Sequence, residues 1–257
     1  MKYSGLTDIG RYRMENQDAF SITPLTDNAV LAVVCDGMGG AAGGQIASSL
    51  AVSSFVSSVI AEIAEKSVSL ADKSNDNLSI LELILKDATA QANREVYSYA
   101  KDSLDLVGMG TTLVSCLCID NECVICNVGD SRLYHITKHS IDQVTRDHSY
   151  VQMMIDTGML TKEEARAHPD RNVIMRAVGT RPVVTAETFR ITLHEKETLL
   201  LCSDGLSGFA SNETIFSILW GNEERFDQSE EDKVKALIDA ANQGGGRDNI
   251  TAVTLTY

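Results

Sequence analysis

The chain has 257 residues, and its 36 aspartates and glutamates outnumber its 22 lysines and arginines, which gives a formal net charge of −14. An apolar fraction of 44% with 23% charged residues is typical of a folded protein and excludes a largely disordered chain. The negative charge argues against nucleic acid and against anionic membranes as partners, because both are bound by clustered lysine and arginine. A phosphate-bearing substrate would therefore meet a protein of its own sign.

Strand and helix patterns follow one another along the chain without a Pro-rich or Gly/Ser-rich linker. The apolar run 30–35 predicts a strand, which leads into a glycine loop and a helix from about 45 to 66. Apolar residues from Leu81 to Val96 recur at helical spacing and predict a second helix. Further strands are predicted at 111–119, 122–128, 131–136, about 184–191, about 197–202 and 250–257, with helices at about 213–220 and 231–242 and short helical pieces within 145–180.

The predicted strand at 111–119 is apolar on both of its faces. Leu113 and Leu117 lie on one side of it, and Val114 and Cys116 lie on the other. A strand that is buried on both faces needs cover on both faces. Together with the two long helices, this pattern predicts stacked sheets with helices packed outside them.

Residues 37–61 carry no charged side chain and could be mistaken for a membrane span. A membrane helix is apolar all round, whereas this segment is expected to be amphipathic. It separates a serine face at Ser49, Ser53 and Ser57 from an apolar face at Ile46, Leu50, Val56 and Ile60. We therefore expect a core helix and no membrane partner.

The cysteines indicate a reducing compartment rather than a metal site. Four of the six lie in apolar runs, where a free cysteine behaves as a small buried hydrophobe. Cys123 and Cys126 have CxxC spacing, but a zinc ribbon needs a second such pair. The N-terminal residues MKYSGLTDIGRYR lack the apolar segment of a secretory signal, so we expect a cytoplasmic protein.

The most informative pattern is the placement of aspartates at strand ends. Asp36, Asp130, Asp204 and Asp248 each lie beside an apolar strand and a glycine. A strand end orients the carboxylate, and the glycine allows a ligand to approach the backbone. One Asp-Gly pair after a strand is most often a turn, but four such sites in one chain indicate a common function.

If these carboxylates converge, cations must neutralise their like charges. Oxygen ligands without histidine or cysteine select Mg²⁺ or Mn²⁺ over Zn²⁺, and two such ions about 3.5–4 Å apart are a recurring device for attack on phosphorus. The phosphoryl oxygens need a cationic anchor as well. Arg11 and Arg13, close to Asp18, are the candidates.

Seven segments of the chain carry motifs in a fixed order. They are TDIGRYRMENQDAF (7–20), VVCDGMGG (33–40), GMGTTL (108–113), NVGDSRLYHI (127–136), the segment 145–180, LLLCSDGLSGF (199–209) and GGGRDNITAVTLTY (244–257). In these motifs the chain resembles the metal-dependent protein phosphatases, the type 2C Ser/Thr phosphatases, in their compact bacterial form. The resemblance implies an α+β fold, with a central β-sandwich of two antiparallel sheets flanked by helices on both outer faces (α-β-β-α layers). It also implies one catalytic domain over 1–257, with 145–180 as a flap beside the active site.

The resemblance implies two core Mn²⁺ or Mg²⁺ ions and a weaker third ion. Asp36 resembles the ligand that bridges the core ions, and the carbonyl oxygen of Gly37 resembles a ligand of one of them. Asp204 and Asp248 resemble the remaining ligands of the other. Asp130 matches, together with Asp204, the site of the third ion.

Two further residues receive roles from the resemblance. Arg13 matches the phosphate-binding arginine of the family, whereas Arg11 stands two residues too early. Asp18 resembles a carboxylate that holds metal-bound water. The implied reaction is hydrolysis of phosphoserine and phosphothreonine by a metal-bridging hydroxide, in opposition to a Ser/Thr protein kinase. Phosphorylated proteins, including such a kinase, are the expected partners, and we expect a monomer.

The chain departs from the family at several positions. Met38 stands where many eukaryotic members have a histidine proposed as general acid, so the proton donor to the leaving group is unassigned. Gln17 replaces a glutamate of those members, which leaves one metal more dependent on water and on Asp18. For His148 and His168, in the flap-like segment, surface hydrogen bonding and a substrate role are both open.

Other sites suggested by the glycines fail. Gly37, Gly39 and Ala42 match a relaxed dinucleotide-binding fingerprint, but residue 62, where an acidic strand end is needed, lies inside a predicted helix. The Walker A spacing fails because Gln45 replaces the lysine, and the segment 205–209 lacks the second glycine of a nucleophile elbow. Two functional alternatives remain: a catalytically dead, phosphoprotein-binding module, and a regulatory phosphatase under the control of another chain.

Overall fold

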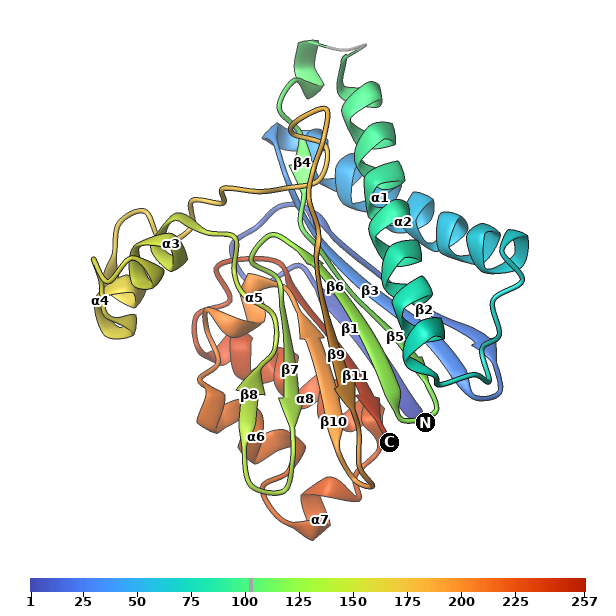
Figure 1. Ribbon diagram of the computed structural model, residues 1–257. Coiled ribbons are helices and arrows are strands. Elements are labelled where there is room, and N and C mark those ends of the chain that lie inside the picture. Colours follow the sequence, from blue (N-terminus) through green and yellow to red (C-terminus); the bar gives the residue numbers. More distant parts are fainter. Residues whose placement is uncertain (102–103) are drawn as a thin grey trace.

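Two antiparallel sheets face each other at the centre of the molecule (Figure 1). The computed structural model describes residues 1–101 and 104–257, apart from the side chains of residues 41, 42, 104 and 166. The first sheet has the order β1 (Lys2–Asp8), β11 (Ile250–Thr256), β10 (Thr198–Cys202), β7 (Arg132–Ile136) and β8 (Ile141–Gln143). The second has the order β2 (Asp18–Thr26), β3 (Ala29–Met38), β5 (Leu113–Ile119), β6 (Glu122–Val128) and β9 (Glu187–Thr192), and the short β4 (Gly110–Thr111) pairs with β3.

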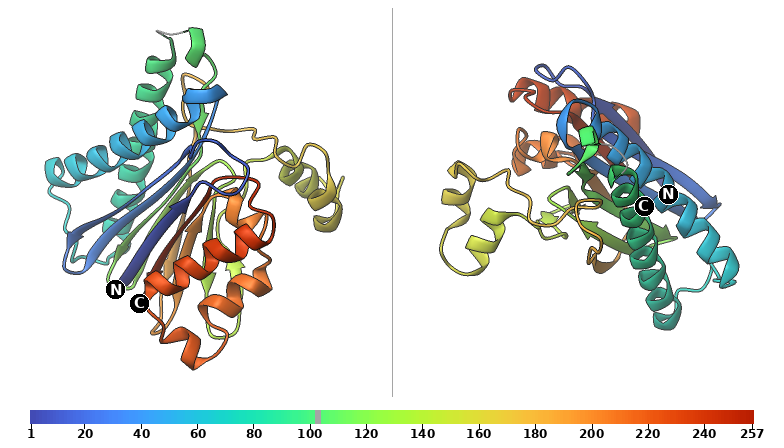
Figure 2. Two further views of the ribbon diagram at one scale, coloured as in Figure 1. Left: turned by 180° about the vertical axis from the view of Figure 1, so that it is seen from behind. Right: turned by 90° about the horizontal axis from the view of Figure 1, so that it is seen from above.

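Helices cover the outer face of each sheet (Figure 2). Helices α1 (Gly40–Glu65) and α2 (Asn75–Lys101) lie on the second sheet. Helices α5 (Asp204–Ser207), α6 (Asn212–Leu219) and α8 (Glu230–Gln243) lie on the first, and the short α7 (Glu223–Phe226) follows α6. The expected α-β-β-α sandwich is therefore confirmed.

Alternation along β3 explains why its sequence is apolar without interruption. Leu31 and Val33 belong to the core beneath α1 and α2, whereas Val30 and Val34 belong to the core between the two sheets. Because successive side chains of a strand point to opposite faces, a strand with a core on each side needs both sets to be apolar.

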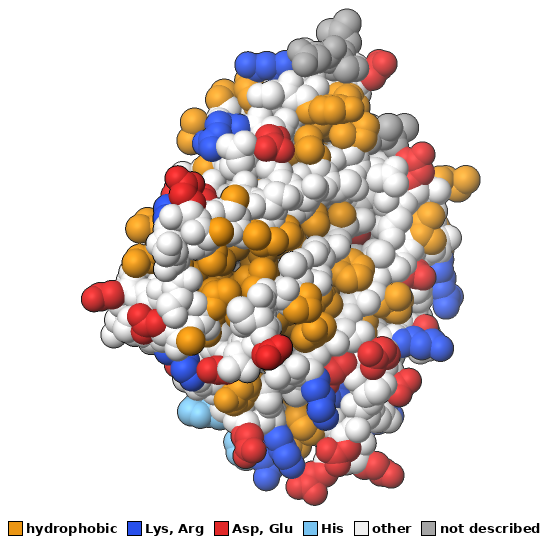
Figure 3. All heavy atoms as spheres, turned by 90° about the vertical axis from the view of Figure 1, so that its right-hand side faces the viewer, with side chains coloured by type: hydrophobic (Ala, Val, Ile, Leu, Met, Phe, Trp, Pro, Cys, Tyr) orange, Lys and Arg blue, Asp and Glu red, His pale blue; other side chains and the backbone are white. Residues whose placement is uncertain are grey.

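Helix α1 is long and apolar enough to cross a membrane by length and composition, and residues 43–65 pass that test. In the fold one of its faces is buried against the sheet and α2, through Ala47, Ala51, Phe55 and Val59. Of the predicted apolar face, Ile46, Leu50 and Val56 are partly buried and pack against this core, whereas Ile60 is exposed. The predicted serine face is exposed. Apolar and uncharged side chains cover much of the middle of the molecular face on the side of α1 and α2 (Figure 3).

Strands β1, β2 and β8 were not predicted. Each forms an edge of its sheet, and β8 has only three residues. Strands β1 and β2 contain half-exposed polar residues, so neither shows a clear apolar pattern. Two predicted boundaries also shift. Helix α1 begins inside the glycine run, at Gly40, and β9 begins only at Glu187.

The segment 145–180 leaves the sandwich and carries two short helices, α3 (Tyr150–Asp156) and α4 (Lys162–Ala167), which project away from the sheets (Figure 2). It returns through an isolated bridge between Ser149 and Ile174 and another between Thr111 and Val178. A cavity of about 600 Å³ lies beside it, lined by residues from 146–157 and 175–187.

Candidate active site

Asp18 and Asp36 face each other across two paired strands. Asp18 begins β2, and its Cα partner in the antiparallel register is Asp36 near the end of β3. The oxygen Oδ2 of Asp18 accepts hydrogen bonds from the hydroxyls of Ser203 and Thr251, both at 2.7 Å. These two hydroxyls connect the second sheet, which carries Asp18, to the first.

Asp204 and Asp248 reach the same place from the first sheet. Asp204 follows β10 as the first residue of α5, and Asp248 precedes β11. The two segments touch, because a Cβ atom on Gly205 would lie 1.9 Å from the carbonyl oxygen of Asn249. Asp130 follows β6, is 8% exposed and, like Asp18, has a buried Oδ1 atom without a hydrogen-bond partner.

The carboxylates lie close enough together to raise one another's pKa values. Burial raises the pKa of Asp18 to about 7, against the hydrogen bonds from Thr251 and Ser203. Burial and the charge of Asp204 raise the pKa of Asp130 to about 8. The pKa of Asp204 rises to about 6 through burial and the charge of Asp248, and a hydrogen bond with Asp36 opposes the rise. For Asp36, which keeps partial solvent contact, burial and then the charges of Asp18 and Asp204 raise the pKa well above its ordinary range.

The backbone around Asp36 is fixed by two neighbouring threonines. The Asp36 N–H donates to Thr112 Oγ1 at 2.8 Å, and the Asp36 carbonyl accepts from Thr111 Oγ1 at 2.8 Å and from the Thr112 N–H at 2.9 Å. Gly37 follows in a space that excludes any side chain, since a Cβ atom there would lie 2.1 Å from the carbonyl oxygen of Gly44. The site therefore requires glycine at position 37.

Arg13 lies at the edge of the cluster. Its Nη2 atom donates to Asp248 Oδ2 at 2.7 Å, and this hydrogen bond raises the pKa of Arg13. Its side chain is 52% exposed, so the guanidinium is accessible to a ligand. The backbone N–H of Arg11 instead donates to the Gly246 carbonyl at 2.7 Å, which joins the N-terminal loop to the loop before Asp248.

Several supporting residues were not predicted. Asn249 accepts the Gln17 N–H at 2.9 Å and donates to the carbonyls of Ile9 and Glu15, so it fixes the loop that carries Arg13. Ser203 and Asn249 are each adjacent in sequence to a candidate aspartate, and this adjacency was the one available signal. Thr251 gave none, because a threonine inside an apolar strand is common.

The remaining candidates lie outside the carboxylate cluster or beside it. The side chain of His148 is buried and contacts the backbone of Gly129, one residue before Asp130. His168 is half-buried at the end of α4 and accepts the Asp170 N–H at 3.1 Å. Met38 ends β3, and a thioether cannot donate a proton.

The cluster fits hard divalent cations by its chemistry. Its donors are oxygens, and the partnerless Oδ1 atoms of Asp18 and Asp130 together with the raised pKa values mark unbalanced negative charge. Among the described residues, Cys116, Cys118 and Cys123 are the group whose three potential ligand atoms lie within 4.8 Å of one another. Within the same part of the chain, no three aspartates of the cluster bring carboxylate oxygens that close together. All six cysteines are buried and unpaired, and Cys123 and Cys126 lie in different cores, so the CxxC sequence forms no site.

Comparison with known proteins identifies the family. A family model described as protein phosphatase 2C matches residues 11–240. The serine/threonine phosphatase stp of Listeria monocytogenes is 35% identical over 247 residues, which cover 96% of this chain and 92% of that protein. The crystal structure of the serine/threonine phosphatase Stp1 from Staphylococcus aureus is similar with a TM-score of 0.87 and 34% identity, over 99% of this chain and 94% of that chain.

A second similar crystal structure contains metal. It is the catalytic domain of the serine/threonine protein phosphatase PstP in complex with 2 manganese ions, with a TM-score of 0.75 and 31% identity over 98% of this chain and 96% of that chain. The chain therefore belongs to the protein phosphatase 2C family of metal-dependent Ser/Thr protein phosphatases, as its motifs predicted.

Proposed function

We propose that the chain hydrolyses phosphoserine and phosphothreonine esters of proteins at the aspartate cluster, with two Mn²⁺ or Mg²⁺ ions and a weaker third. The observation that carries the proposal is the convergence of buried and half-buried carboxylates from both sheets at one place, with an accessible arginine at its edge. A cluster of like charges whose pKa values are raised is unfavourable in itself, and divalent cations relieve it.

The assignment of ligands follows the family motifs. Asp36 and the carbonyl oxygen of Gly37 would hold the core ions together with Asp204 and Asp248, and Asp130 would join Asp204 at the third. When bound, the ions would neutralise the carboxylates and lower the pKa of water, which supplies the expected hydroxide nucleophile. Support comes from the two manganese ions in the PstP relative and from the all-oxygen donor set.

The chain's own side chains would bind the substrate and control protons. Ser203 and Thr251 hold Oδ2 of Asp18, which leaves its Oδ1 atom without a partner. This Oδ1 atom would accept a hydrogen bond from water. Arg13 would release Asp248 and donate to the phosphoryl oxygens instead, because the carboxylate of Asp248 would then hold a metal ion. The overall reaction converts a phosphate ester and water into an alcohol and inorganic phosphate. Because Met38 cannot donate a proton, the oxygen of the leaving alcohol would take its proton from water.

The metal assignment also accounts for the overall charge. The five candidate aspartates belong to the 36 acidic residues of the chain, and two divalent ions would add four positive charges where the phosphate binds. The local field would then favour an anionic substrate although the net charge is −14.

We further propose that residues 1–257 act as one catalytic domain with 145–180 as a flap, and that the protein is a cytoplasmic monomer. Its partners would be phosphorylated proteins, including a Ser/Thr kinase that it opposes. The cavity of about 600 Å³ beside the flap offers space for residues that flank a phosphorylated side chain.

The test is phosphate release from a phosphothreonine peptide, first with Mn²⁺ and then with excess EDTA. We expect turnover with Mn²⁺, its loss in EDTA, and no turnover in Asp204→Ala. The matched control is Asp142→Ala, an exposed position of β8, which should retain wild-type turnover. Activity that persists in EDTA would refute the metal mechanism, and an inactive wild type that still binds phosphopeptide would favour the catalytically dead module.

A further inference from the structure

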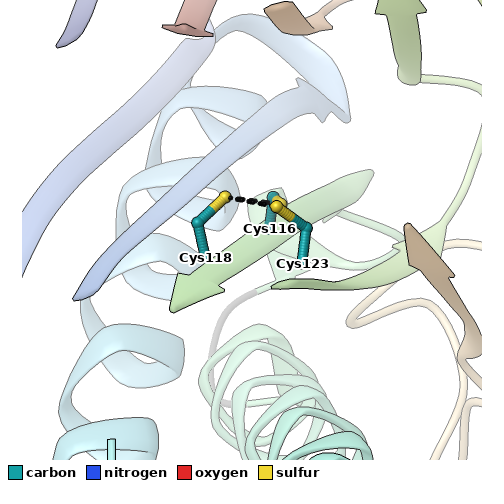
Figure 4. A group of neighbouring side chains, drawn as sticks. All are labelled: Cys116, Cys118 and Cys123. Carbon is teal, nitrogen blue, oxygen red and sulfur yellow. Dashed lines mark hydrogen bonds between the residues drawn. The ribbon is translucent and has the colours of Figure 1, made fainter. Parts of the chain in front are cut away.

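Three cysteine side chains meet in the core between the two sheets (Figure 4). The S–H of Cys123 donates to Cys118 Sγ at 3.0 Å, and Cys116 Sγ lies 3.4 Å from Cys118 Sγ. Each of the three residues is at most 1% exposed. The proposed phosphatase reaction uses none of them.

Strand geometry explains the meeting. Cys116 and Cys118 are two residues apart in β5, so they point to the same face, and the register places Cys123 of β6 directly opposite Cys118. The hairpin turns at Asp120 and Asn121, where Asp120 has the positive φ of 51° that a tight turn needs. The pair therefore lies only two residues from a surface turn.

Charge argues against a metal at this place. No fourth histidine, cysteine or carboxylate within the described ranges joins the three sulfurs, whereas structural zinc takes four protein ligands. Three thiolates with one divalent ion would leave an uncompensated negative charge among aliphatic side chains such as Val30, Ile125 and Leu199, and a cuprous ion would leave more. A covalent bond between two sulfurs leaves no charge.

Geometry then selects one pair of sulfurs. A disulfide needs Cα atoms about 4.4–6.8 Å apart, and directly opposed residues of an antiparallel pair are about 4.5–5.5 Å apart. Cys116 and Cys123 are diagonal neighbours, at about 7–8 Å. Cys116 and Cys118, two residues along one strand, lie at the upper limit of the range, at about 6.6 Å.

We propose that Cys118 and Cys123 are an oxidative modification site, which a hydroperoxide converts into a reversible cross-strand disulfide. Cys118 is the thiol to react first, because its sulfur is the one that contacts both of the others, and hydrogen bonds to a thiolate stabilise it. Its thiolate attacks a peroxide oxygen and gives a sulfenic acid, with loss of water or alcohol. The Cys123 sulfur then attacks Cys118 Sγ, the sulfur–sulfur bond forms, and a second water leaves.

The test maps disulfides in the full chain after treatment with hydrogen peroxide. Free thiols are alkylated under denaturing conditions, and cleavage after Glu122 separates the two cysteines unless a disulfide joins them. We expect linked peptides that fragment to Cys118–Cys123 and that separate with dithiothreitol. Sulfoxide formation at Met14, which is 92% exposed, reports that the oxidant has acted.

Cys123→Ala should abolish the linked species, whereas Cys126→Ala, at a buried position of the same strand facing the other core, should leave it unchanged. Cys116→Ala should still give the Cys118–Cys123 link, but more slowly, because Cys118 loses one of its two hydrogen-bond partners. The proposal fails if Met14 is fully oxidised while Cys118 and Cys123 remain alkylatable, or if another pair is linked. It also fails if protein refolded with Zn²⁺ retains one equivalent of metal that these cysteines hold.

Discussion

His148 and Gly129 exchange two hydrogen bonds: the Gly129 N–H donates to His148 Nδ1 at 3.0 Å, and the His148 N–H donates to the Gly129 carbonyl at 2.9 Å. Gly129 immediately precedes Asp130, and His148 lies near the start of the segment proposed as a flap. Since Nδ1 accepts, the ring proton is on Nε2, which lies 3.2 Å from Glu187 Oε1 and 3.1 Å from Arg176 Nη1. The histidine thus connects the flap-like segment to the loop of a candidate metal ligand.

Replacement of His148 by alanine should destabilise the protein by about 1–3 kcal/mol, because the buried Gly129 N–H loses its acceptor. Asparagine at this position carries an acceptor close to that of Nδ1, so His148→Asn should recover part of the loss. Urea unfolding of both variants measures the two free energies. Equal destabilisation by alanine and asparagine would show that the ring volume, and not the acceptor, matters.

The raised pKa values of the aspartates predict how the stability of the metal-free protein depends on pH. Asp18 titrates at about 7, Asp204 at about 6 and Asp130 at about 8 in the folded state, against about 3.9 when unfolded. Between these values the folded chain binds more protons than the unfolded chain. Its free energy of unfolding should therefore fall as pH rises from about 4 to about 8, and then level off.

The measurement is the Tm in EDTA across this pH range, compared with Asp18→Asn, which should show a shallower fall because it removes one titrating group. With saturating Mn²⁺ the stabilisation should grow as pH rises, since ligation requires the deprotonated carboxylates. The assignment would be contradicted if the Tm of wild type in EDTA, compared with the Tm of Asp18→Asn, increased between pH 5 and pH 8.

The sequence predicted the layers of the fold because the strand at 113–119 is apolar on both faces, which only a sheet covered on both sides explains. It did not predict the edge strands β1 and β2, which have one neighbour each and need little apolar surface. Periodicity selected the buried side of α1, since the predicted serine face is exposed and Ile46, Leu50 and Val56 pack against the core. It did not identify the residues at the centre of that side, because two of them, Ala47 and Ala51, are small and carry little hydrophobic signal.

Four of the aspartates were found because each stands near a glycine at a strand end, a pattern that is visible locally, whereas Asp18 was assigned from the resemblance to the family. The hydroxyls of Ser203 and Thr251 were not, since their contact with Asp18 spans more than 180 residues of chain and depends on how the two sheets face each other. The meeting of Cys118 with Cys123 likewise depends on the exact hairpin register. Roles that arise from contact between distant segments leave no local trace.

The two arginines of the N-terminal loop provide a matched pair for phosphate binding. Arg13 contacts Asp248, whereas the described contact of Arg11 is made by its backbone, which a substitution preserves. Arg13→Ala should lower kcat/KM for a phosphopeptide by about 10- to 100-fold, the loss of a charge-assisted hydrogen bond. Arg11→Ala should stay close to wild type in steady-state kinetics. Equal losses in both variants would indicate a general effect of positive charge.

A buried ion pair on the opposite side of the molecule offers a stability test that is separate from catalysis. Lys233 Nζ donates to Glu230 Oε1 at 2.8 Å, both residues are at most 5% exposed, and the ammonium lies 4.5 Å from the centre of the Phe226 ring. Lys233→Met leaves the Glu230 carboxylate buried without its cation. This should cost about 3–5 kcal/mol.

The double variant with Glu230→Gln should lose less than Lys233→Met alone, because it removes the charge that is left unpaired. Urea unfolding of wild type, the two single variants and the double variant gives the coupling free energy, and turnover below the unfolding transition should match wild type in each variant. If the double variant were less stable than Lys233→Met, Glu230 would be stabilised by groups other than Lys233, and the contact of the lysine with Phe226 would account for the loss.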